Sequence, residues 1–143
     1  MDTKTPNDYD YVEESAEDSM RDTHELIRYI HSLDHYSEGH EHLVQPILTP
    51  RYALSCSRDL LTRLGSLAAS EPTLRIQTHI SENETEVINT LQKFTETKSY
   101  AEVYDIYGLL RENTFLAHAV HLTKDEVKLI NQEKRNGDKP LSN

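Results

Sequence analysis

The sequence predicts an α/β fold in which a parallel sheet of about three strands is flanked by helices. Three short apolar runs alternate along the chain with longer segments whose apolar residues recur at helical spacing. Strands that alternate with helices form right-handed βαβ units, and these units place their strands side by side in parallel. A closed parallel barrel needs eight strands, so we expect only part of such an arrangement.

The first half of the chain is expected to form an irregular arm, two helices and one strand. Residues 1–13 are polar and acidic, and the spacing of apolar residues over 15–33 predicts a helix. Residues 43–49 (LVQPILT) form a short apolar run that Pro50 stops, which is typical of a buried strand. The next helix is predicted over 57–70, with a serine as its N-cap.

The second half repeats the alternation of strand and helix. Residues 73–80 (TLRIQTHI) predict a strand, and Ser81 with Glu84 forms an S-x-x-E capping box ahead of a helix. A shorter helix is predicted over 100–110 and a third strand over 113–119 (NTFLAHA).

A final helix is expected after a second capping box, which Thr123 and Glu126 form. Residues 135–143 are expected to be a polar tail, so the folded segment would span 14–134.

Composition excludes several functional classes. The net charge is −10, of which −9 falls on residues 1–50, and an acidic chain is a poor ligand for a nucleic-acid backbone or an anionic membrane. No apolar run is long enough to cross a membrane, so a cytoplasmic location is the default expectation. Cys56 is the only cysteine, which excludes an intramolecular disulfide and a cysteine metal cluster. Its thiol would be reactive only if its pKa were lowered.

Two histidines are predicted at the carboxyl ends of strands, where functional residues of α/β folds gather. His79 lies near the end of one strand and His118 near the end of the next. If the strands are neighbours, both imidazoles can converge on one metal ion, and zinc accepts such ligands while keeping a position open for water. Glu82 follows at the turn into a helix, where its carboxylate could take a proton from that water.

Other interpretations of these residues remain open at this point. Glu82 could be a first-turn acid that favours the helix dipole, and His118 could be a hydrogen-bonded core histidine. His121 might be a third ligand, although a loop or surface role is favoured. Three further histidines lie in a polar loop and are expected to be solvated: His35, His40 and His42.

Three segments in this order and at these separations closely resemble the guanine deaminase family of the amidohydrolase superfamily. They are Thr49–Ser57 (TPRYALSCS), Gln77–Asn83 (QTHISEN) and Phe115–His118 (FLAH). The similarity runs from Met1 to about Ile130. It implies a segment of a (β/α)8 TIM-like barrel with one zinc ion, which deaminates guanine to xanthine and ammonia in purine catabolism as a homodimer.

The resemblance also implies roles for individual residues. His79 and His118 match the zinc ligands after the fifth and sixth barrel strands, and Glu82 matches the catalytic glutamate that moves protons. Arg51 matches the arginine that recognises the purine ring, and Tyr52 takes the place of an aromatic neighbour. The Ser-Cys-Ser stretch after them has no chemical role that the resemblance assigns.

The chain departs from the family pattern in two ways. The family has a His-x-His pair after its first strand, and here that spacing occurs only at His40 and His42 in a polar loop. The zinc-binding aspartate after the eighth strand has no counterpart. We therefore expect an internal fragment that is inactive alone, because a catalytic zinc site typically has three or more protein ligands.

Two alternative functions remain. The chain could be a non-catalytic interaction module that pairs with full-length subunits through exposed sheet edges. It could also belong to an amidohydrolase that acts on a related heterocycle such as adenine, cytosine or a triazine. The TPRY segment at 49–52 favours guanine.

Overall fold

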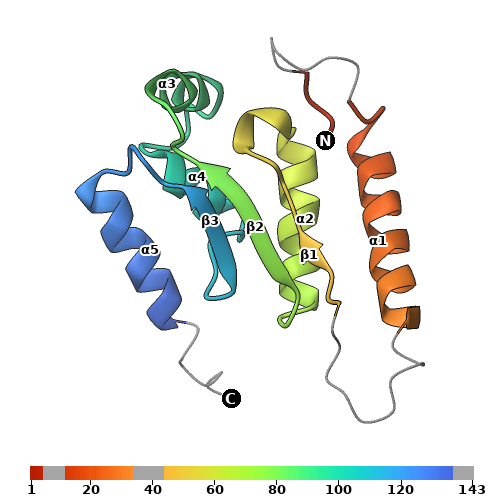
Figure 1. Ribbon diagram of the computed structural model, residues 1–143. Coiled ribbons are helices and arrows are strands. Elements are labelled where there is room, and N and C mark those ends of the chain that lie inside the picture. Colours follow the sequence, from red (N-terminus) through yellow and green to blue (C-terminus); the bar gives the residue numbers. More distant parts are fainter. Residues whose placement is uncertain (5–11, 34–43, 137–143) are drawn as a thin grey trace.

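The computed structural model describes residues 1–4, 12–33 and 44–136, and these contain a three-stranded parallel sheet (Figure 1). Strand β1 (Ile47–Leu48) pairs with β2 (Arg75–Ile80), and β2 pairs on its other side with β3 (Thr114–His118). The strand order follows the chain order, as expected when successive βαβ units add to the same side of a sheet. The predicted α/β class, with about three parallel strands and flanking helices, is confirmed.

The described residues also contain five α-helices and one short 3-10 helix, which precede, connect or follow these strands. They are α1 (Ala16–Ser32), η2 (Ala53–Ser55), α2 (Arg58–Ser70), α3 (Glu84–Lys93), α4 (Tyr100–Ile106) and α5 (Lys124–Asn136). The side chains of Ser15 and Ser57 cap α1 and α2 by accepting hydrogen bonds from backbone amides of the first turn. Helix α4 ends before the predicted Leu110, because Gly108 has a φ of 69° and leaves the helical path.

One predicted capping box is wrong and the other is confirmed. Helix α3 is capped by Asn83, whose side-chain oxygen accepts the Glu86 amide at 2.9 Å, and not by Ser81. Ser81 still belongs to the turn after β2, where its φ of 51° makes it unable to serve as a cap. At the start of α5, Thr123 and Glu126 exchange the hydrogen bonds of a capping box.

The two faces of the sheet differ in what covers them. Ile76, Thr78 and Ile80 of β2 point to the helical side and are buried, whereas Gln77 and His79 alternate to the other side. Helices α2 and α4 pack behind the sheet, and no described element covers the side that faces the viewer in Figure 1. The carboxyl ends of the strands and this open face are therefore accessible together.

None of the helices in the described ranges combines the length and apolar character that a bilayer crossing requires.

Gly65 marks a close approach between α2 and the end of α4. A Cβ atom at this position would lie 1.8 Å from the backbone carbonyl oxygen of Tyr107. That oxygen belongs to the main chain and cannot rotate away, so the contact requires glycine.

Replacing Gly65 with alanine is expected to destabilise the fold by about 2 kcal/mol, because overpacking against backbone outweighs the gain in helix propensity. The midpoint of thermal unfolding, followed by circular dichroism, should fall by roughly 4–8 °C. Ser66→Ala, one residue further along α2 on its exposed side, is the matched control and should leave the midpoint almost unchanged. An unchanged midpoint for Gly65→Ala would contradict this packing.

Candidate functional site

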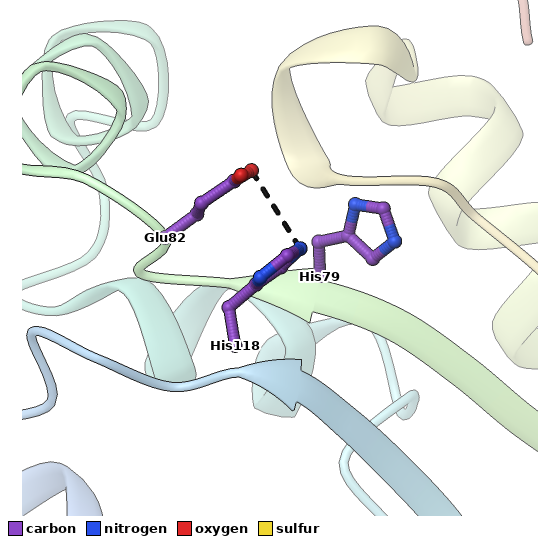
Figure 2. Close-up of side chains that lie close together, drawn as sticks. All are labelled: His79, Glu82 and His118. Atoms are coloured by element: carbon purple, nitrogen blue, oxygen red, sulfur yellow. Dashed lines mark ion pairs between the residues drawn. The ribbon is translucent and has the colours of Figure 1, made fainter.

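His79 and His118 meet at the carboxyl edge of the sheet. The parallel register pairs His79 with Ala117 and Ile80 with His118, so the two histidines lie one residue apart in the register at the ends of adjacent strands. Their ring centroids are 4.8 Å apart and the rings are nearly perpendicular, at 85°. Figure 2 shows both rings above the strand ends, together with the side chain of Glu82. The expected convergence of the two imidazoles is therefore present.

The backbone at the end of β3 turns His118 toward its neighbour. Thr114 and Leu116 point to the helical side, so strict alternation would send residue 118 the same way. Instead, His118 and Ala119 adopt φ values of 68° and 55°, a left-handed conformation that costs a non-glycine residue about 1 kcal/mol or more. The His118 side chain remains 36% exposed, which excludes the core-histidine interpretation.

Glu82 completes the cluster from the turn between β2 and α3. Its Oε2 lies 3.7 Å from Nε2 of His118, and its side chain is 52% exposed. Because Asn83 is the N-cap, Glu82 precedes the helix and is not a first-turn acid of α3. A carboxylate on a short turn beside an imidazole can exchange protons with a molecule bound between them.

The three side chains form a group that could hold a metal ion. One ligand atom from each of His79, Glu82 and His118 lies within 4.8 Å of the other two. Two imidazole nitrogens and a carboxylate oxygen are donors that zinc and related metals accept. His121 is not part of this group: it is exposed, and its backbone amide donates to the carbonyl of Ser81. His35, His40 and His42 lie outside the described residues.

Arg51 and Tyr52 lie in the loop after β1, which runs beside His79 at the end of β2. The Arg51 carbonyl accepts the backbone amide of His79 at 2.9 Å, which ties this loop to the site. The Arg51 guanidinium lies over the Tyr52 ring, 5.6 Å from its centroid, and Arg51 also lines a groove of about 560 Å³ between α1 and β1. Arg51 is thus joined to His79 through the main chain, and Tyr52 follows it in the same loop.

Comparison with known proteins decides the family. The amidohydrolase family model matches residues 2–139. The chain belongs to the amidohydrolase family. A probable guanine deaminase of Schizosaccharomyces pombe is 49% identical over 84% of this chain, and the guanine deaminase of Dictyostelium discoideum is 39% identical over 100% of this chain.

Solved structures show the same similarity. The crystal structure of a guanine deaminase from C. acetobutylicum with bound guanine has a TM-score of 0.77 and 34% identity over 93% of this chain. The amidohydrolase segment described here spans 22% of the S. pombe relative, 30% of the D. discoideum relative and 29% of the crystallised one.

The Ser-Cys-Ser stretch of this amidohydrolase shapes the loop that carries Arg51. The Ser55 hydroxyl donates to the carbonyl of Tyr52 at 2.8 Å, and Ser57 caps α2. Cys56 is fully buried between them, and Lys93 donates to its carbonyl. The cap by Ser57 agrees with the sequence prediction, whereas sequence patterns did not indicate the contacts of Ser55 and Cys56.

Several residues that support the site were also missed. Glu86 accepts the backbone amide of Glu82, and Tyr104 donates to the carbonyl of His79. Asn83-x-x-Glu86 is a visible capping pattern, and it overlaps the Ser81 pattern that was favoured. The tyrosine gives no such signal, because a buried aromatic residue on a helix is usually core.

We predict that the isolated chain binds Zn²⁺ through this cluster, and that His79→Ala and His118→Ala each weaken binding by about tenfold or more, because a ligand is lost. Isothermal titration of each variant with Zn²⁺ measures this change. His121→Ala is the matched control, since this exposed histidine lies outside the cluster. Equal affinity for all four proteins would show that the cluster is not a metal site.

Cys56 is predicted to resist alkylation. Burial raises the pKa of its thiol to about 11. At pH 8 its thiolate fraction is therefore about 100-fold lower than in the unfolded chain, and the thiolate is the nucleophile. Iodoacetamide should modify the folded chain at least that much more slowly than the chain in concentrated urea, as mass spectrometry can measure. Similar rates in both conditions would mean that Cys56 is accessible.

Proposed function

We propose that residues 1–143 contribute to a zinc-dependent guanine deaminase, which hydrolyses guanine to xanthine and ammonia. The cluster of His79, Glu82 and His118 at the open edge of the sheet carries this proposal. It is supported by the similarity to guanine deaminases, one of which was crystallised with guanine.

His79 and His118 are proposed to hold the zinc ion. Their rings come from adjacent strand ends and are close enough to share one ion, as the distances within the cluster indicate. When bound, zinc lowers the pKa of a water molecule so that hydroxide is available near neutral pH. Further ligands are required to complete the site, so the isolated chain is proposed to be inactive in deamination.

Glu82 is proposed to move protons. Its carboxylate, beside His118 and open to the front of the sheet, accepts a proton as oxygen adds to the guanine carbon that bears the amino group. This proton then passes to the departing amine, so that ammonia leaves as the ring C–N double bond re-forms, and the hydrogen of the added hydroxyl moves to the ring nitrogen, which gives the carbonyl of xanthine. A carboxylate that carries a proton between two steps must stay mobile at its tip, which a half-exposed side chain allows.

Arg51 and Tyr52 are proposed to position the purine. The guanidinium is an always-charged donor that can form charge-assisted hydrogen bonds to oxygen or nitrogen acceptors of the base, and the aromatic ring offers a face for stacking. The hydrogen bond between the Arg51 carbonyl and the His79 amide fixes this loop relative to the proposed zinc ligand. Substrate recognition and metal binding would therefore share one stretch of main chain.

We predict that Glu82→Gln lowers kcat for guanine by about 10²–10⁴, because glutamine cannot accept and return the proton. The measurement uses a hybrid polypeptide in which this chain replaces the matching segment of the S. pombe relative, which is 49% identical and supplies the remainder of that protein. Deamination is followed by the release of ammonia.

The control for this experiment is Glu84→Gln, which alters an exposed carboxylate in the first turn of α3 and should not change kcat. Unchanged turnover with Glu82→Gln would contradict the role of Glu82. An inactive hybrid that is folded and contains zinc would contradict the proposed guanine deaminase function.

A further inference from the structure

A buried network of polar side chains lies directly behind the candidate site. Its members are on β2, α3 and α4, and all of them are at most 8% exposed: Thr78, Glu86, Tyr100 and Tyr104. Burial of a polar group in a protein core costs free energy unless the group forms hydrogen bonds. In this network the bonds end on the main chain of two residues of the site, His79 and Glu82.

Tyr104 holds the backbone of His79. Its hydroxyl donates to the His79 carbonyl at 2.7 Å and accepts a hydrogen bond from the Thr78 hydroxyl, also at 2.7 Å. Strand β1 ends at Leu48, opposite Ile76, so the sheet ladder has stopped before it reaches this carbonyl. The tyrosine thus takes the place of a strand partner, while Arg51 binds the amide of the same histidine.

Glu86 holds the backbone of Glu82. Oε2 of Glu86 accepts the Glu82 amide at 2.9 Å, and Oε1 accepts the hydroxyl of Tyr100 at 2.6 Å. Both carboxylate oxygens are therefore used as acceptors, and the buried side chain has one orientation that satisfies them. The Tyr100 oxygen in turn accepts the amide of Ala53, in the loop that carries Arg51, at 3.4 Å.

The two tyrosines make a single rigid unit. They lie one turn apart on α4, with ring centroids 5.6 Å apart and an interplanar angle of 24°. Burial, as the largest cause, raises the pKa of both phenols, so both hydroxyls keep their protons and remain donors at physiological pH. One short helix therefore fixes the carbonyl of His79 and, through Glu86, the amide of Glu82.

We propose that Tyr104 is a positioning residue for His79, and that Glu86 with Tyr100 positions Glu82. The inference rests on the proposed function, because it assigns these buried groups to a metal ligand and a proton carrier. None of the three touches the open face, so each acts through the main chain of a site residue.

The geometry of the turn explains why such support matters. Ser81 lies between His79 and Glu82 and has a φ of 51°. This left-handed conformation is unfavourable for serine, so neighbouring contacts must hold it. The direction of the Glu82 side chain follows from this main chain. Displacement of a catalytic group by about 1 Å can lower a rate by about 100-fold.

The proposed role of Glu86 is tested in the 143-residue chain by hydrogen exchange of the Glu82 amide, measured by NMR. Glu86→Ala removes the acceptor, and exchange at Glu82 should become about tenfold faster, the equivalent of one hydrogen bond. Glu86→Gln keeps an acceptor oxygen and should restore most of the protection. Unchanged exchange in Glu86→Ala would overturn the role of Glu86, and this readout does not depend on any enzymatic activity.

The proposed role of Tyr104 is tested by Zn²⁺ titration of the same chain, followed through the NMR resonances of the histidine rings. Tyr104→Phe should raise the Kd for Zn²⁺ by about tenfold, in the range seen when support to a metal ligand is lost. Tyr107→Phe, a partly buried tyrosine just after α4, is the matched control and should not change Kd. Gly65→Ala controls for lost stability, because it should lower the unfolding midpoint without changing Kd.

Kinetics in the hybrid polypeptide separate positioning from a purely structural role. Glu86→Ala should lower kcat by about tenfold or more while KM for guanine stays within about threefold, because Glu82 moves protons and does not bind the base. Tyr100→Phe should lower kcat in the same way, but KM can change as well because Tyr100 also accepts the Ala53 amide in the loop of Arg51. A Kd that is unchanged in Tyr104→Phe would overturn the assignment of that tyrosine. Failure of the hybrid to deaminate guanine would instead contradict the proposed function, and exchange at Glu82 would still decide the role of Glu86.

Discussion

The parallel pairing of β2 with β3 is the constraint on which the site depends. Because Ile80 lies opposite His118, both strands end at one level and their exit turns are joined. The Ala119 amide donates to the Ile80 carbonyl, and the amides of residues 120 and 121 donate to that of Ser81. These bonds hold left-handed backbone at both exits, a conformation that would otherwise relax. The relative position of the two imidazoles is therefore set by the register of β2 and β3.

Helix α4 connects the carboxyl edge of the sheet to the hydrophobic core, although it has only seven residues. A helix of that length has little stability of its own, so tertiary contacts must hold it. At its first turn the Ala101 amide donates to the buried carboxylate of Glu126, which also serves in the capping box of α5. At its inner face Tyr100 and Tyr104 are fully buried. The loop after β3 and the turn after β2 are therefore connected through the same short helix.

The sequence predicted which residues gather at the strand ends, but it did not predict the contacts that hold their main chain, and the reasons are physical. His79 and His118 could be placed because the carboxyl ends of parallel strands meet at one edge, a rule that needs only the order of elements. The left-handed φ of His118 could not be predicted, since histidine adopts that conformation more often than most residues but still only rarely. The cap of α3 was misassigned because Ser81 and Asn83 are both good N-caps, and only the length of β2 decides between them. The bond from Tyr104 to His79 joins residues 25 apart, and no local pattern encodes it.

The cluster of His79, Glu82 and His118 lies on the open face of the sheet, opposite the helices. His79 and Gln77 point to this face from β2, and Phe115, 57% exposed, points to it from β3. On the helical side, Tyr104 and Glu86 form hydrogen bonds to the main chain of His79 and Glu82. The hydrogen bonds to the main chain thus lie on the helical side of the sheet, and the accessible face is the opposite one. Further ligands or a substrate can approach from the open side without disturbing the contacts that orient the cluster.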